Sequence, residues 1–146
     1  MIQKKDFYVP PEGPPQERPN PAIFAKMGEA NIFQMLEDFY LKLEKSDIRN
    51  LFPADMKQAS KKSGAFFVFL LGGPPLYQEQ HGSPMMRQRH MAFTIDEDAR
   101  QVWLDCFRKT LINAESKYNF PSEYLDEFMA FLERFSLWMV NTRKQA

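Results

Sequence analysis

The chain has 146 residues with 19 basic and 19 acidic side chains, so its net charge at neutral pH is zero. This length fits one domain, and the balanced charge argues against a nucleic-acid partner. The longest apolar run, residues 64–73, is about half of a membrane span, and no apolar signal segment follows the first lysines, so we expect a cytoplasmic protein that does not enter a membrane. A single cysteine and two histidines exclude an internal disulfide and a multi-histidine zinc site.

The N-terminal part of the chain is rich in proline. Six of the 11 prolines fall between Pro10 and Pro21, where they remove backbone donors and favour extended conformations. We therefore expect residues 1–22 to form a disordered or loosely packed extension and residues 23–146 to form the domain. A PxxP-type spacing leaves a second interpretation, in which the extension docks on a proline-binding partner.

The rest of the chain shows the apolar spacing of helices. Residues 31–45 place their apolar side chains on one helical face. A second helix is expected over residues 56–71, almost wholly apolar in its second half, and Gly72-Gly73-Pro74-Pro75 ends it. An irregular loop is expected through residues 81–84, and Pro84 can open a short helix after it.

Two more helices complete the pattern. Thr94 or Asp96 can cap a helix with an apolar inner stripe, and Pro121 starts a last helix that runs to about Asn141. The 14 Phe, 5 Tyr, 2 Trp and 9 Met outnumber the β-branched residues, which favours a helical, aromatic-rich core. The sequence thus predicts an all-α domain of four long helices and one short helix.

One histidine stands in a pattern that carries chemistry. Neither histidine lies in a nucleophile triad motif, and the paired glycines end a helix instead of cradling a phosphate. His90, however, follows Arg87 and Arg89 and precedes the apolar Met91 and Phe93. A neutral imidazole on an apolar face can bind the metal of an organic ring, and the cations can reach the carboxylates of that ring. The pattern suits a haem site, although a histidine beside arginines is also common on protein surfaces.

The stretch GGPPLYQEQHGSPMMRQRHMAF, followed by TIDEDARQVWLDCF, resembles the bacterial truncated haemoglobins, specifically their group II. The resemblance extends upstream to MGEANIFQMLEDFY and LFPAD and downstream to the last helix, and it covers residues 23–141. It implies a truncated globin-like fold, the two-over-two helical sandwich, in which the segment with the iron-binding histidine is mostly loop. It also implies protohaem (haem b), with its iron, as the cofactor.

The resemblance implies a role for four residues at the metal. His90 would be the iron ligand, with its second ring nitrogen bonded to a backbone carbonyl, whereas His81 would be a loop residue. Trp103 and Tyr40 would donate hydrogen bonds to a ligand on the iron, which implies high oxygen affinity. In the ferric state the Tyr40 phenolate could instead approach the iron.

Further positions complete the cofactor-binding set that the resemblance implies. Phe52 stands where some relatives carry tyrosine, Ala59 leaves a path open for small ligands, and Ser63 offers a weak polar contact. The cationic positions near the haem propionates would be Lys62 and Arg89. The residues lining the macrocycle would be Phe66, Tyr77, Met86, Phe93 and Phe107.

Three functions fit these residues. The first is a haem protein that binds dioxygen, and also carbon monoxide or nitric oxide. The second is an enzyme, either a nitric oxide dioxygenase or peroxidase-like, which would need a separate reductase because this length leaves no room for a flavin or nicotinamide domain. The third is a cofactor-free helical interaction module, which predicts no Soret absorption.

Overall fold

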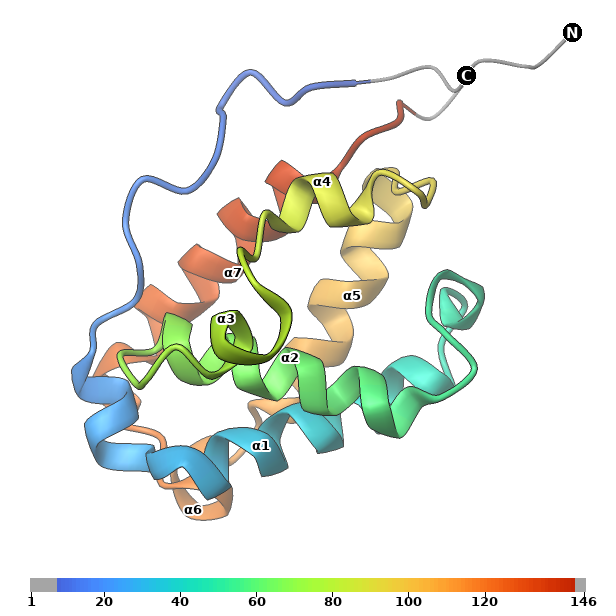
Figure 1. Cartoon of the computed structure of the whole chain (residues 1–146). Coiled ribbons are helices and arrows are strands. Elements are labelled where there is room, and N and C mark those ends of the chain that lie inside the picture. The colour runs from blue at the N-terminus through green and yellow to red at the C-terminus, as the bar shows by residue number, and fades with distance from the viewer. Residues whose placement is uncertain (1–7, 144–146) are drawn as a thin grey trace, which may run out of the picture.

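The computed structural model of the chain describes residues 8–143, and every regular element within this range is helical (Figure 1). The all-α prediction is therefore confirmed. None of the described helices is long and apolar enough to cross a membrane. The elements in chain order are α1 (Ala22–Glu44), η1 (Arg49–Leu51), α2 (Met56–Leu70), α3 (Leu76–His81), α4 (Met86–His90), α5 (Glu97–Thr110), α6 (Ala114–Tyr118), η2 (Ser122–Tyr124) and α7 (Leu125–Met139).

The four long helices pack as two pairs, α1 against α2 and α5 against α7, and α1 also contacts α5 (Figure 1). Phe107 of α5 lies where the pairs meet. Its ring centroid is 4.2 Å from that of Phe39 on α1, 5.7 Å from that of Phe67 on α2 and 5.7 Å from that of Phe128 on α7. Aromatic pairs at these separations stabilise a core beyond the area they bury. This cluster joins the two layers into one domain.

Local chemistry explains where the long helices begin and end. The Asp55 side chain accepts a hydrogen bond from the backbone N–H of Gln58 and caps α2, and Asp96 caps α5 in the same way through Ala99. Of the two expected caps for α5, the structure thus uses Asp96. Gly72 follows α2 with φ at 112°, a backbone conformation that favours glycine.

The structure corrects several predicted boundaries. The first helix begins at Ala22 instead of residue 31 and bends at Gly28, whose φ is 77°. The last helix starts only at Leu125, after a 3-10 turn, and ends at Met139. Two short helices, α3 and α6, were not predicted. Helix α3 buries only Tyr77, and α6 buries only Ala114 and Tyr118. One or two buried residues are too few to give a periodic apolar pattern.

Residues 8–21, which we call the N-terminal strap, run along the outside of the helices to the start of α1 (Figure 1). Tyr8 donates its backbone N–H to the Asn141 carbonyl, and Asn20 donates its own to the carboxylate of Glu127. The guanidinium of Arg18 lies 4.6 Å from the centre of the Phe69 ring. This part of the predicted extension is thus attached to the domain near both of its ends, while most of its residues are exposed. The first seven residues of the predicted extension and the last three of the predicted domain lie outside the described residues.

Candidate functional site

A cavity of about 460 Å³ lies between α1, α2, α3, α4, α5 and α7. This volume is in the range of pockets that hold organic ligands and cofactors. The residues that the sequence analysis assigned to a haem site and that line this cavity are Tyr40, Phe52, Ala59, Lys62, Ser63, Phe66, Tyr77, Met86, Arg89, His90, Phe93 and Trp103. Residues far apart in the sequence are thus brought together around one space.

Phe107 is the exception among the assigned residues. It is fully buried in the aromatic cluster and does not line the cavity. Its ring lies 5.4 Å from that of Trp103, which does line the cavity. Phe107 therefore supports the cavity wall from behind, through its contact with Trp103.

His90 is presented to the cavity from α4 as a neutral imidazole. Its Nδ1 atom lies 2.6 Å from the carbonyl oxygen of Met86, one helical turn earlier. A carbonyl only accepts, so Nδ1 carries a proton, and in the neutral ring Nε2 then keeps its lone pair. Desolvation of the partly buried ring lowers the pKa of His90, and the bond to Met86 opposes that effect. The donor atom that haem iron needs is therefore available at neutral pH.

Tyr40 and Ser63 form a polar pair in an otherwise largely apolar part of the cavity. The Tyr40 hydroxyl of α1 lies 2.8 Å from the Ser63 hydroxyl of α2, and either oxygen can donate. Burial raises the pKa of Tyr40, and the bond to Ser63 acts against that rise. The phenol therefore stays protonated at neutral pH, which favours its role as a donor over that of a phenolate. The neighbouring Phe52 ring lies 5.7 Å from the Tyr40 ring.

The two assigned cations occupy different environments. Lys62 is exposed on α2 where it lines the cavity. Arg89 also lines the cavity, but its guanidinium donates to the carbonyls of His81, Ser83 and Pro84 over 2.6–3.0 Å. It also lies 5.3 Å from the centre of the Tyr77 ring. Arg89 thus orders the loop before α4 while it faces the cavity.

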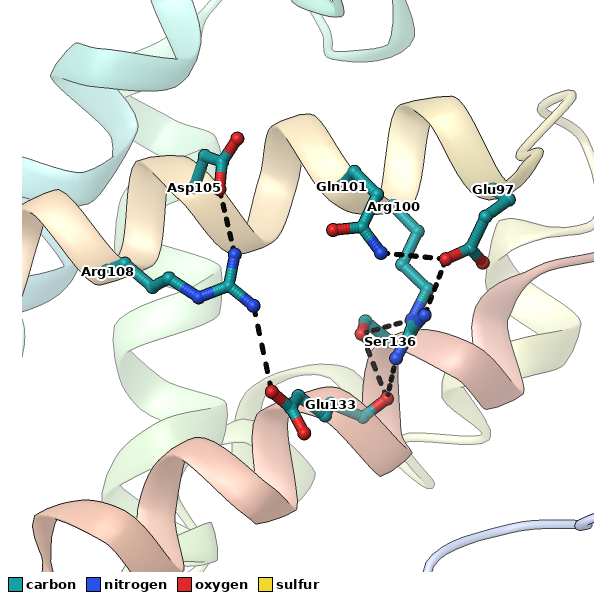
Figure 2. A network of polar contacts seen from close by, with 7 residues as sticks. All are labelled: Glu97, Arg100, Gln101, Asp105, Arg108, Glu133 and Ser136. Carbon is teal, nitrogen blue, oxygen red and sulfur yellow. Dashed lines mark hydrogen bonds and ion pairs between the residues drawn. The ribbon is translucent and has the colours of Figure 1, made fainter.

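The wall formed by α5 and α7 includes an arginine that the sequence analysis did not assign. Arg100 lines the cavity and donates to the Ser136 hydroxyl at 3.0 Å, to the Glu133 carbonyl at 2.9 Å and to Glu97 at 2.7 Å. Figure 2 shows these bonds together with Arg108, which pairs with Asp105 and with Glu133. The two arginines tie α5 to α7 and so fix the wall from which Trp103 projects.

Other cavity residues were also missed, and their signals can now be identified. Phe135 and Met139 are apolar residues one helical turn apart on α7, and both face the cavity. Arg100 lies one helical turn before Trp103 on α5, and that spacing was the available signal. Taken together, a neutral imidazole, apolar walls and flanking cations suit a flat apolar ring with carboxylate arms.

Comparisons with known proteins agree with this geometry. The sequence profile of the bacterial-like globin family matches residues 22–141. The group 2 truncated haemoglobin YjbI of Bacillus subtilis is 34% identical over 91 residues, which cover 62% of this chain and 69% of that protein. Two curated plant relatives are matched over only 53% and 51% of their own length.

Solved structures share the fold. Phosphate-bound Hell's gate globin IV superposes with a TM-score of 0.82 and 34% identity, over 99% of this chain and 88% of that one. Truncated oxygen-avid haemoglobin from Bacillus subtilis gives a TM-score of 0.74 and 30% identity, over 84% of this chain and 99% of that one. The expected two-over-two helical sandwich is therefore confirmed.

Proposed function

Because the chain belongs to the bacterial-like globin family of haem-binding proteins and, within it, to the group II truncated haemoglobins, we propose that it binds dioxygen reversibly on protohaem (haem b). Carbon monoxide and nitric oxide would be alternative ligands. His90 would hold the haem through its iron, and the bound haem would supply the metal at which a diatomic ligand binds. The unpaired, buried Cys106 suits reducing conditions, and we place this activity in the cytoplasm.

One observation carries the proposal: His90 and the hydrogen-bonded pair Tyr40 and Ser63 line the same cavity. His90 keeps its lone pair on Nε2 because Nδ1 donates to Met86. Tyr40 keeps its phenol proton because burial raises its pKa. Both protonation states are those that a histidine ligand and a hydrogen-bond donor need. The Bacillus subtilis relative described as oxygen-avid supports the choice of dioxygen.

The remaining lining residues have roles that follow from their chemistry. Trp103 would be a second donor through its indole N–H, and Phe52 and Phe66 would keep water from the ligand. Lys62 and Arg89 would pair with the two carboxylates of the cofactor. These donors are held on helices before any ligand enters, so little reorganisation is needed when charge develops on the ligand.

An absorption spectrum tests the proposal. The purified protein, loaded with haem, would be measured in the ferric state and after reduction, with and without carbon monoxide. A Soret band that shifts with carbon monoxide is expected, and His90→Ala should change it. His81→Ala is the matched control, because this second histidine lies on α3 against Tyr77 and does not line the cavity. A protein that takes up no haem would instead be a cofactor-free helical module.

A further inference from the structure

Helix α4, which carries His90, packs only weakly on the core, through the partly buried side chain of Met86. It has five residues, none of them fully buried. A single helical turn is not stable by itself, because nucleation outweighs the few bonds formed. The preceding Met85 has a φ of 35°, which is unfavourable for a residue with a side chain. The position of His90 therefore depends on polar contacts from elsewhere in the chain in addition to the packing of Met86.

Arg87 supplies the first of these contacts. Its guanidinium donates to the carbonyls of Trp138 at 2.6 Å and Val140 at 2.7 Å, at the end of α7, and to the carbonyl of Tyr8 at 2.7 Å. It also lies 4.8 Å from the centre of the Trp138 ring. The last carbonyls of a helix lack partners within it, and a cation there is favoured by the helix dipole. One side chain of α4 thus binds both ends of the described chain.

Asn141 supplies the second contact. It is fully buried, and its side-chain amide donates to the carbonyls of His90 at 3.3 Å and Phe93 at 3.0 Å. Its side-chain oxygen accepts from the backbone N–H of Ile95 at 3.0 Å. Its own carbonyl accepts from the backbone N–H of Tyr8 at 2.9 Å. The residue that holds the segment after His90 therefore also holds the strap.

We propose that Arg87 and Asn141 are positioning residues for His90, and that with Tyr8 they form a terminal clamp that sets the orientation of the imidazole. The inference rests on the proposed role of His90 as the iron ligand. Within the clamp the strap is a working part of the site, because Tyr8 bonds to Arg87 and to Asn141 at once. The bond from Nδ1 of His90 to Met86 also depends on the helical turn that the clamp holds.

The test compares two arginines that make the same kind of bonds. Arg87→Met keeps an unbranched apolar side chain similar to the aliphatic part of arginine but removes the donors to three carbonyls. Arg49→Met is the matched control, because Arg49 donates to the carbonyls of Phe52, Pro53 and Ala54 in the segment between α1 and α2. Both variants should melt at a lower temperature than the parent protein. Only Arg87→Met should act on His90.

Two readouts separate positioning from general stability. Hydrogen–deuterium exchange of the haem-loaded protein should be about tenfold faster over residues 86–95 in Arg87→Met, and unchanged there in Arg49→Met. The iron–histidine stretching band of the reduced protein, measured by resonance Raman spectroscopy, should shift or broaden only in Arg87→Met. Deletion of residues 1–9, which removes Tyr8, should reproduce both changes and serves if Arg87→Met does not fold.

Each outcome supports or overturns either the clamp or its role in positioning His90. Equal exchange over residues 86–95 in the two arginine variants would overturn the clamp. Faster exchange with an unmoved iron–histidine band would overturn the positioning role, because the helix would then loosen without moving the imidazole. Failure of the proposed function would look different: the parent protein itself would lack the Raman band.

Discussion

Replacing Tyr40 by phenylalanine removes one hydroxyl from the cavity and leaves the ring between Phe39 and Phe52, whose centroids lie 5.6 and 5.7 Å away. Dioxygen gains negative charge when it binds to ferrous haem, so a donor beside it makes a charge-assisted hydrogen bond. Such a bond contributes about 1.5–3 kcal/mol, and each 1.4 kcal/mol is about a factor of ten. Tyr40→Phe should therefore speed the dissociation of dioxygen about 10- to 150-fold.

The assay is stopped-flow displacement of dioxygen by carbon monoxide. Tyr118→Phe is the control, since Tyr118 is a buried tyrosine whose hydroxyl bonds to Asp38 away from the cavity. It should leave the rate unchanged. Dissociation of carbon monoxide should respond less to Tyr40→Phe, because that ligand gains little charge. A change in dioxygen dissociation below about twofold, or an equal change for both ligands, would refute the donor role of Tyr40.

The other predictions concern stability. Burial, and then the bond to Asp38, raises the pKa of Tyr118, so the folded protein keeps this proton above the pH at which the unfolded chain loses it. The free energy of unfolding should therefore fall above pH about 10, and in urea titrations Tyr118→Phe should lack that fall. Gly72→Ala should lower the melting temperature more than Gly82→Ala. Both glycines have positive φ, so both substitutions are strained. An alanine Cβ at position 72 would also meet the backbone of residue 21 at 2.6 Å, whereas at position 82 it would meet nothing within 4 Å. Asp96→Ala should lose about 1 kcal/mol in chemical denaturation, because the cap of α5 is removed.

The long helices could be predicted because their signals are local. The helix expected over residues 56–71 is observed as Met56–Leu70, with an acidic cap before it and paired glycines after it. Helices α3 and α6 could not be predicted in this way. Their five or six residues span less than two turns, so no apolar repeat can develop. They form because the chain between long helices must satisfy its backbone groups while it turns.

Most residues of the candidate site could be predicted through the resemblance. The residues that could not be predicted have a physical explanation. Phe107 and Phe135 both belong to apolar stripes of long helices, and the sequence gives them the same character. The structure places Phe107 among aromatic rings and Phe135 at the cavity. Periodicity identifies the buried face of a helix, but it does not say where that face meets a neighbour and where it meets an open space.

The proline-rich strap shows a further limit of local reasoning. Prolines remove donors, and the sequence therefore predicts few backbone hydrogen bonds inside residues 8–21. The strap is held instead by hydrogen bonds to distant residues, as in the bond from Arg87 to the Tyr8 carbonyl. Contacts separated by 79 positions in the chain leave no periodic trace in the sequence. An extension can thus be ordered without any helix or strand of its own.

The polar groups of the cavity are held in two physically different ways. Tyr40, Ser63 and Trp103 project from long helices with buried faces, so displacing them requires the core to open. His90 projects from a single turn that has no fully buried residue and is fixed by polar contacts to both chain ends. Regions with few buried apolar contacts open locally at lower free energy than the core does. The proposed donors for the ligand should therefore stay in place as long as the domain is folded, whereas His90, the proposed iron ligand, should be released by local opening. The clamp raises the free energy of that opening, which gives the proline-rich extension a physical role in retaining the cofactor.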